Sequence, residues 1–339
     1  MSFCGSALNK HCNRLLFQVN FIDMAVILLT GGTGMIGKAL AKALLKKGHE
    51  VIVLTRSIGS GSSEKGISFA VWNPEKQEID TAAFGKADHI IHLAGAGVAD
   101  KRWTVKRKQE IVQSRVQGGE LIVKSLQTIP NKIKTVVSAS AIGWYGADDP
   151  SMMKKFVETD PAAEDFLGQT CSQWEQSTGP AASLQKRLVL FRIGIVLSNT
   201  GGAYKEFIKP LKWRVAAILG NGKQIISWIH IDDVVRLFIA ALENEKFSGV
   251  YNAVAPQPVS NKELVLAMAR SRKKRFISVK VPSFVLKWML GEMSTEILKS
   301  ATVSCDKVVS EGYSFQFPDI NSAVIALTSQ VNSSGLISA

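Results

Sequence analysis

The fold of this chain is decided by one glycine-rich stretch, Thr30-Gly31-Gly32-Thr33-Gly34-Met35-Ile36-Gly37. The stretch contains GxGxxG, follows an apolar run at residues 25–30, and precedes apolar residues at helical spacing from 35 to 47. Glycine permits a tight turn and lets backbone amides approach a pyrophosphate, while the helix N-terminus offers unpaired donors and a positive dipole end. We therefore predict a strand, a phosphate-binding loop and a helix, with all eight residues of the stretch binding a dinucleotide.

The same alternation of strand and helix continues along the chain. Apolar runs at 51–55, 88–93, 135–139 and 188–193 predict further strands, and residues 105–127 predict a long helix. This spacing is typical of an α/β protein with a Rossmann, doubly wound parallel sheet. The pattern weakens after about residue 195, and residues 256–330 show helices with little strand signal. We predict a Rossmann domain over residues 25–255 and a smaller, mostly helical C-terminal substrate lobe over 256–330.

The first 24 residues do not resemble the rest of the chain. They hold one acid and no long apolar run, which argues against a secretory signal. Two interpretations stay open: a weak organelle-targeting peptide, or an upstream start codon with Met24 as the natural start. The second is favoured because a strand begins at Ala25.

Composition limits the classes of partner. The chain has 339 residues, 46% of them hydrophobic, which is typical of a globular protein. None of the four cysteines forms a CxxC pair, which argues against a disulfide framework or a zinc site and favours a reducing, cytoplasmic location. No apolar run reaches ~18 residues, so we expect neither a membrane-spanning helix nor a membrane partner.

The net charge of +13 raises the question of nucleic acid. The densest basic run, residues 270–275, lacks interleaved aromatic residues and follows an amphipathic segment. A solvated helix end is the better interpretation, and we expect no nucleic-acid partner.

The string His230-Ile231-Asp232-Asp233 has no second cluster to support a metal site, so no metal site is predicted. Asp232 or Asp233 is expected to cap a helix starting at Val234.

Cofactor choice depends on the end of the second strand. Enzymes that prefer NAD carry an acid about 20 residues past the glycines, where it holds the ribose 2′-hydroxyl. This chain has Arg56 there, and a guanidinium suits a 2′-phosphate. We therefore predict NADP, with NAD as the weaker alternative. Leu93, Ala94 and Gly95 end the strand at 88–93, and small residues there let a dinucleotide lie against the sheet edge.

These motifs resemble the extended short-chain dehydrogenase/reductases. The glycine stretch, His92-Leu93-Ala94-Gly95 and residues 138–146 (SASAIGWYG) carry that resemblance. Further segments are similar to the atypical epimerase family proteins often called YfcH-like, which have their own C-terminal domain: residues 102–104, 114–116, 174–175, 192–197, 227–233, 251–252, 255–256, 291–293 and 312–315. The resemblance covers about residues 25–327. It implies NADP at the glycine loop and Arg56, and a homodimer that pairs through the helix near 105–127, but it implies no substrate.

The catalytic residues depart from the pattern of that superfamily. Its members use a Tyr-x-x-x-Lys helix, in which the tyrosine transfers a proton while hydride passes at the nicotinamide. No tyrosine of this chain is followed four positions later by lysine. The helix expected near 164–176 places Phe166 and Thr170 roughly at the two positions. Ser140, which matches the family serine, and Tyr145 remain as candidate catalytic residues, each with a structural role as the alternative.

Two functions therefore stay open. The first is an NADP-dependent oxidoreductase or epimerase-like enzyme, acting on an unknown small substrate for which a nucleotide-linked compound is a candidate. The second is a non-catalytic NADP-binding sensor or regulatory protein. The fold favours the first function, and the missing Tyr-x-x-x-Lys pair favours the second.

Overall fold

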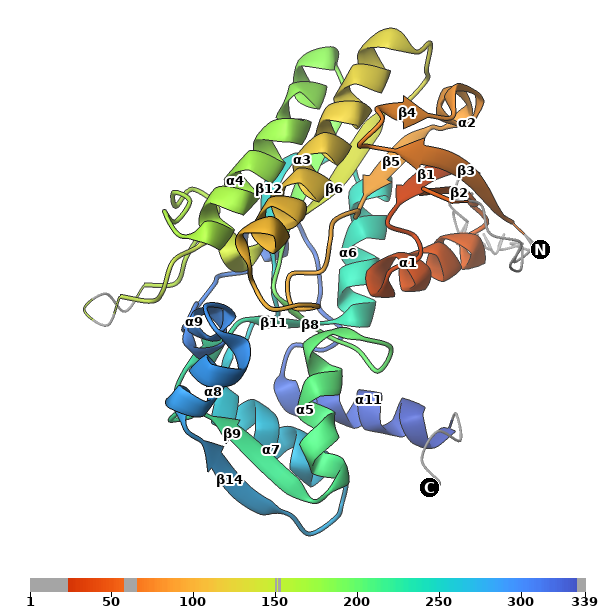
Figure 1. Cartoon of the computed structure of the whole chain (residues 1–339). Coiled ribbons are helices and arrows are strands. Elements are labelled where there is room, and N and C mark those ends of the chain that lie inside the picture. Colours follow the sequence, from red (N-terminus) through yellow and green to blue (C-terminus); the bar gives the residue numbers. More distant parts are fainter. Residues whose placement is uncertain (1–23, 58–65, 150, 152–153, 334–339) are drawn as a thin grey trace, which may run out of the picture.

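The computed structural model describes residues 24–57, 66–149, 151 and 154–333. The N-terminal extension expected at residues 1–24 lies outside the described residues, except for Met24. The core of the molecule is an eight-stranded sheet in the order β12-β7-β6-β5-β1-β2-β3-β4 (Figure 1). Its strands are β1 (Val26–Thr30), β2 (Glu50–Thr55), β3 (Ile67–Asn73), β4 (Glu78–Ile79), β5 (His89–His92), β6 (Thr135–Ala141), β7 (Arg187–Ile193) and β12 (Gly249–Ala253).

The sheet is parallel apart from its last strand, β4, which runs antiparallel to β3. The chain builds outward from β1 through β2 to β3, and then returns to place β5 on the other side of β1. The strand order therefore reverses between β1 and β5, and such a switch point opens a crevice at the carboxyl ends of the strands. The predicted Rossmann sheet is confirmed, and the glycine stretch follows β1 at the crevice.

Helices cover both faces of the sheet (Figure 1). On one face α1 (Met35–Lys46) packs beside α6 (Ile231–Glu243), and their apolar sides share a core with β1, β2 and β7. On the other face lie α2 (Thr81–Lys86), α3 (Val105–Thr128) and α4 (Phe166–Thr178), with α3 packed along α4. The spacing of Leu40 and Leu44 explains why α1 buries a single stripe, and Gly48, at φ +87°, ends it.

A smaller lobe packs below the sheet (Figure 1). Its elements are α5 (Gly202–Lys212), β9 (Val215–Leu219), α7 (Asn261–Ser271), β14 (Ile277–Val281), α8 (Ser283–Leu290), α9 (Met293–Leu298) and α11 (Ile320–Ser333), and it has its own apolar core. A capping box between Ser260 and Glu263 starts α7. Because α5 and β9 pack with α7, this lobe is built from two separate stretches of the chain.

Short elements join the two parts. These are β8 (Ile195–Leu197), β10 (Ile225–Ile226), β11 (Trp228–His230), β13 (Val259–Ser260) and α10 (Asp306–Ser310). Two 3-10 segments, Ile142–Trp144 and Gly179–Leu184, pack against α4 and β7. Among the described residues, no helix combines the length and the apolar character needed to cross a bilayer.

The expected start of α6 at Val234 is wrong. The helix starts at Ile231, and its cap is His230, whose Nδ1 accepts a hydrogen bond from the amide of Asp232 at 3.1 Å. Asp233 caps nothing. Its buried carboxylate accepts from the amides of Gln316 and Phe317 at 2.8 and 2.9 Å, so it holds the chain before α11.

Candidate functional site

The glycine stretch forms a tight loop at the carboxyl end of β1. Gly31 has φ +68°, and the amide of Gly34 donates to the carbonyl of Gly31 at 3.0 Å. A Cβ at Gly31 would lie 2.8 Å from the carbonyl carbon of Leu93, and one at Gly37 would lie 2.2 Å from the Gly31 oxygen. Both positions therefore require glycine, one for the turn against β5 and the other for the close approach of α1 to the loop.

The first turn of α1 is open at its N-terminus. Gly34 is the N-cap residue, and no side chain caps the helix. The amides of the first helical turn have no intrahelical acceptors, so they present donors and the positive end of the helix dipole to the crevice. This arrangement is chemically suited to a phosphate group.

Thr30 joins the two strands that flank the crevice. Its Oγ1 lies 2.8 Å from Nδ1 of His92 and accepts from the amides of Leu93 and Ala94 at 3.1 and 3.2 Å. His92 is fully buried, and burial, followed by the charge of Arg115, lowers its pKa to about 4. His92 is therefore neutral at pH 7. We infer that Thr30 fixes the floor of the crevice rather than facing a ligand.

Arg56 lies at the same edge of the sheet. It follows β2, which is paired with β1 so that Leu54 is opposite Thr30. Its side chain is exposed and forms no hydrogen bond or ion pair with any of the described residues. Within that part of the chain, its guanidinium is therefore unpaired, one strand away from the glycine loop.

The strand end at residues 93–97 is held by α3. The amide of Ala96 donates to Oγ of Ser114 at 2.9 Å, and Nη1 of Arg115 donates to the Ala96 carbonyl at 3.0 Å. Burial lowers the pKa of Arg115 to about 10, which leaves it charged at pH 7. Its guanidinium lies 3.2 Å from where a Cβ at Gly95 would be, so glycine there makes room for a buried cation.

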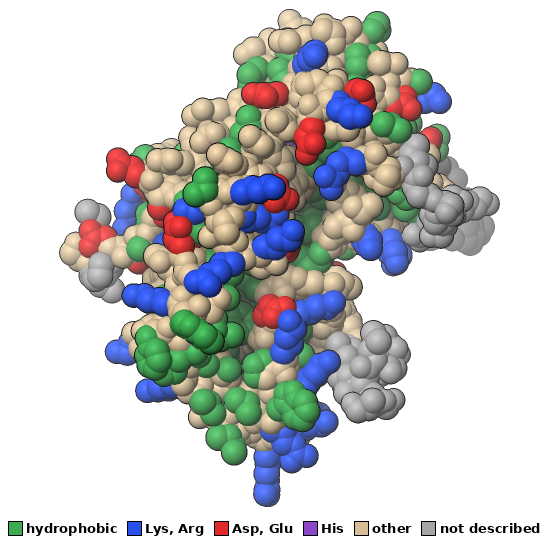
Figure 2. Space-filling model, in the orientation of Figure 1, with side chains coloured by type: hydrophobic (Ala, Val, Ile, Leu, Met, Phe, Trp, Pro, Cys, Tyr) green, Lys and Arg blue, Asp and Glu red, His purple; other side chains and the backbone are tan. Residues whose placement is uncertain are grey.

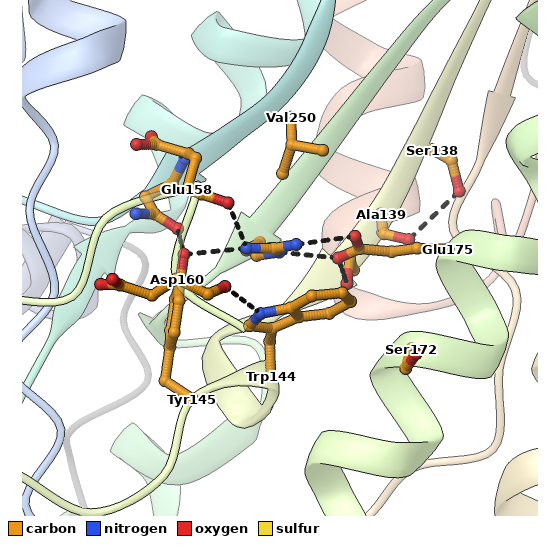
Figure 3. Close-up of polar contacts among 12 residues, drawn as sticks. Ser138, Ala139, Trp144, Tyr145, Glu158, Asp160, Ser172, Glu175 and Val250 are labelled. Carbon is orange, nitrogen blue, oxygen red and sulfur yellow. Dashed lines mark hydrogen bonds and ion pairs between the residues drawn. The ribbon is translucent and has the colours of Figure 1, made fainter. Parts of the chain in front are cut away.

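A buried polar network lies behind the ends of β6 and β7 (Figure 3). Its centre is Arg192, whose guanidinium donates to both carboxylate oxygens of Glu175 at 2.8 and 2.9 Å. The ring of Trp144 lies 3.6 Å from the guanidinium carbon. Burial alone would lower the pKa of Arg192, but the hydrogen bonds and charge of Glu175 outweigh burial and raise it. Arg192 is therefore a buried cation held against the side chain of Glu175.

Both candidate catalytic residues belong to this network. Ser140 donates to Glu175 at 2.7 Å, and the hydroxyl of Tyr145 donates to the side-chain oxygen of Asn252 at 2.7 Å while accepting from Arg192 at 3.1 Å. Ser140 and Tyr145 are buried, and burial raises the pKa of Tyr145 to about 12. Their catalytic roles stay predictions; in this structure each has a structural partner.

The α4 helix corrects the rough placement of the missing Tyr-x-x-x-Lys pair. Phe166 packs edge-on against Trp103, and the hydroxyl of Thr170 donates to the Phe166 carbonyl at 2.6 Å. The residues of α4 that face the turn after β6 are Leu167 and Cys171, one position later, which lie 3.1 and 3.6 Å from a Cβ placed on Gly143. Cys171 is buried, and burial raises its pKa to about 12, so it is a thiol at pH 7.

Neither the register of α4 nor the partners of Ser140 and Tyr145 could have been predicted from the sequence. The spacing of apolar residues on α4 fits either register, and the partners of Ser140 and Tyr145 come from elements 35 and 107 residues away. Among the described residues, no group of three or more His, Cys, Asp or Glu side chains is arranged to hold a metal ion.

Comparisons with known proteins agree with this architecture. The model of the NAD dependent epimerase/dehydratase family matches residues 27–167 and 198–253, and a domain of unknown function, DUF1731, matches residues 281–327. The chain is 34% identical over 297 residues to the epimerase family protein SSP1921 of Staphylococcus saprophyticus, covering 88% of this chain and 97% of that protein. It is also 34% identical over 306 residues to the epimerase family protein YfhF of Bacillus subtilis, covering 89% and 97%.

A solved structure is similar over the whole architecture. The crystal structure of the human epimerase family protein SDR39U1 (isoform 2) with NADPH has a TM-score of 0.79 and 26% identity, covering 90% of this chain and 99% of that one. The likeness therefore includes both the sheet and the smaller lobe.

Proposed function

Because this chain belongs to the NAD dependent epimerase/dehydratase family, as an atypical extended short-chain dehydrogenase/reductase, we propose that it binds NADP in the crevice between β1 and β5. The observation that carries the proposal is the uncapped N-terminus of α1 behind a loop whose Gly31 and Gly37 admit no side chain. Backbone amides at this point suit the pyrophosphate of a dinucleotide.

The proposed contacts follow the carboxyl edge of the sheet. The residues Gly31–Gly37 would hold the pyrophosphate, with the buried Thr30 supporting the loop from beneath, and Leu93, Ala94 and Gly95 would lie along the cofactor. The free guanidinium of Arg56 reads the 2′-phosphate, because a bidentate, charge-assisted contact favours NADP over NAD. The NADPH found with the similar human protein supports this choice.

For the reaction, the proposal is an oxidoreductase or epimerase-like enzyme with an unknown small substrate, a nucleotide-linked compound being one candidate. Bound NADP would supply or accept hydride. Ser140 and Tyr145 remain the proposed residues that contact substrate. Each would first have to exchange its present partner, Glu175 or Asn252, for the substrate.

One observation favours the alternative, a non-catalytic NADP-binding sensor. A proton donor works best with a pKa near the working pH, but the pKa of Tyr145 is raised to about 12 and α4 turns Leu167 and Cys171 toward β6. Burial also raises the pKa of Cys171 to about 12, so neither Tyr145 nor Cys171 has a pKa suited to proton transfer at pH 7.

Two measurements test the proposal. Calorimetric titration with NADPH tests cofactor binding. Binding at one site per chain supports the proposal, and a titration without any binding signal contradicts it. NADPH oxidation in the presence of a panel of carbonyl compounds and nucleotide sugars separates the two functions. Slow, substrate-dependent turnover supports the enzyme, and tight binding without turnover supports the sensor.

Location and assembly belong to the same proposal. The described cysteines, Cys171 and Cys305, are free and buried, which supports the reducing conditions of the cytoplasm. A homodimer paired through α3 is proposed from the resemblance, and analytical ultracentrifugation of the purified chain tests it.

A further inference from the structure

The smaller lobe exposes large apolar side chains that a solvated surface does not need. We define the lobe surface by six of them, all on β14, on α8 or in the turn before β9. The two tryptophans, Trp213 and Trp288, are 83% and 80% exposed. Figure 2 shows hydrophobic side chains gathered over the lower lobe, with basic side chains around them. The six residues are Trp213, Ile277, Val279, Phe284, Trp288 and Met289.

The strand pairing explains part of this surface. β14 pairs in parallel with β9, so that Ile277 is opposite Val215 and Val279 is opposite Ala217. Side chains two residues apart point to the same face of a strand, so all four lie on one face. On the opposite face of β9, Ala216 and Ile218 point into the lobe core. The face that carries the other four side chains is therefore apolar although it is not part of that core. A strand that faced only water on this side would carry polar residues there.

The chain segments that carry the lobe surface contain basic but no acidic side chains. Residues 207–231 and 264–291 contain no aspartate or glutamate. The Lys and Arg side chains beside the apolar residues are exposed, and none of them forms an ion pair within the described part of the chain. They are Lys212, Arg214, Lys273, Lys274, Arg275 and Lys287. The basic run at residues 270–275, which the sequence indicates is a solvated helix end, is thus followed directly by the exposed apolar side chains of β14.

A cavity adjoins the basic side of this surface. It has a volume of about 540 Å³ and lies between the end of α7 and α11. Four cations line it: Arg270, Arg272, Lys273 and Lys274. Ser271 and Thr328 add hydroxyl groups, which bond to each other at 2.9 Å. Lys273 and Lys274 therefore line a hollow that carries four cations and is large enough for a phosphate-bearing headgroup, and they lie close in sequence to the exposed apolar residues of β14.

The basic charge and the exposed tryptophans indicate which kind of partner the lobe surface binds. A second copy of this chain would bring the same cations against the lobe surface, and like charges brought together oppose association. Exposed tryptophans among unpaired lysines and arginines are typical of surfaces that insert into the headgroup layer of an anionic bilayer. An acidic protein would match the charge, but it gives no reason for two tryptophans to be at least four-fifths exposed.

We propose that the lobe surface docks the protein on an anionic membrane, with Trp213 and Trp288 in the headgroup layer and the surrounding lysines and arginines on lipid phosphates. This is peripheral binding and involves no spanning helix. It replaces the sequence-based expectation of no membrane partner, and it does not depend on the proposed cofactor.

Vesicle co-sedimentation tests the proposal. Phosphatidylcholine vesicles, with or without about 30% phosphatidylglycerol, are pelleted with the full chain at low salt and at about 0.5 M salt. We expect binding to the anionic vesicles at low salt, little binding to phosphatidylcholine alone, and weaker binding at high salt. Absence of binding to anionic vesicles, as expected if the surface serves an acidic protein, overturns the proposal.

Two variants separate apolar insertion from charge. Trp213→Ser with Trp288→Ser should weaken binding at least ten-fold, because the rings no longer enter the headgroup layer. Lys273→Glu with Lys274→Glu should weaken it by at least about 25-fold, since each basic residue near the membrane contributes about five-fold. All of these side chains are exposed, so urea unfolding should be unchanged.

Matched controls lie on other faces of the molecule. Val105→Ser removes an apolar side chain that is 76% exposed at the start of α3, and Lys42→Glu with Lys76→Glu reverses two exposed charges near the sheet. We expect vesicle binding close to that of the unaltered chain. If the tryptophan variant binds as tightly as the unaltered chain, or if the controls weaken binding as much as the lobe variants, the assignment of the lobe surface is wrong.

Discussion

Single residues decide whether the crevice can accept a cofactor. A Cβ at Gly37 would overlap the Gly31 carbonyl oxygen, so Gly37→Ala must displace either the loop or the start of α1. We expect a loss of about 1–3 kcal/mol of stability and at least a ten-fold weaker NADPH affinity, measured by urea unfolding and by calorimetry. Gly85→Ala is the control. Gly85 lies within α2, where the nearest atom to an added Cβ is the carbonyl oxygen of Pro130 at 3.4 Å, so this change should leave NADPH affinity intact and alter stability by less than about 1 kcal/mol.

The Arg192–Glu175 pair makes a second prediction at this scale. The two side chains are 3% and 9% exposed, so removing the cation leaves a buried, uncompensated carboxylate. Arg192→Met should lower the free energy of unfolding by about 3–5 kcal/mol. The exposed pair Lys209–Glu206 provides the contrast, and Lys209→Met should change stability by less than about 1 kcal/mol. Equal losses in the two variants would mean that the Ser140–Glu175–Arg192 network does not stabilise the fold.

At the scale of elements, the cap of α6 makes stability depend on pH. Burial lowers the pKa of His230 from 6.5 to about 4. The unfolded chain therefore binds a proton before the folded chain does, and stability present above pH 6.5 is lost as pH falls toward 4. This histidine contributes up to about 3 kcal/mol of that loss.

His230→Asn separates the cap from the titration. Asparagine also accepts a hydrogen bond at an N-cap, but it does not take up a proton. We expect the variant to fold at pH 7 and to lose less stability than the original chain between pH 6.5 and 4.5, as measured by urea unfolding at each pH. An identical pH profile would show that His230 is not the group responsible.

Elements with strong local patterns were predicted correctly. The run at 25–30, the glycine stretch and the helix from Met35 carry their own signals, and the structure confirms them as β1, the loop and α1. β14 was missed because its residues, Ile277–Val281, alternate weakly beside a basic run, and its pairing partner β9 lies 62 residues earlier. Long-range pairing of this kind leaves little trace in local periodicity.

The candidate site, like the fold, was predictable only where the local sequence carries the signal. The dinucleotide loop and the exposed Arg56 follow from local sequence, so their positions at the β1 edge could be anticipated. The burial of Tyr145 and the contact of Ser140 with Glu175 could not, because they depend on how α4 and β12 pack around β6. Asp233 does not cap a helix, as the sequence had suggested it could, because its carboxylate accepts hydrogen bonds from residues more than 80 positions later.

At the scale of the molecule, Asp233 connects the sheet to the smaller lobe. Its carboxylate is fully buried and accepts from Gln316 and Phe317, which precede α11. Asp233→Asn keeps one accepting oxygen but places an NH2 donor against one of the two amides, and we expect a loss of about 2–4 kcal/mol in the free energy of unfolding. Asp232→Asn, at a side chain that is 45% exposed, should cost under about 1 kcal/mol. A loss of similar size in both would contradict this connection.

The two parts of the molecule have separate proposed functions. The sheet and its switch point position the proposed cofactor, and the lobe surface faces outward with unpaired cations. The proposed membrane contact uses β14 and α8, so the two proposals can fail independently.

The central claim is that Arg56 reads the 2′-phosphate of NADP at the glycine loop. Side-by-side calorimetric titrations with NADPH and NADH test it on the unaltered chain, on Arg56→Asp, and on Lys42→Asp as an exposed charge control. The account predicts NADPH binding about 10–100-fold tighter than NADH, a preference lost in Arg56→Asp and kept in Lys42→Asp. Equal affinities for NADPH and NADH in the unaltered chain, or no binding of either, would contradict it.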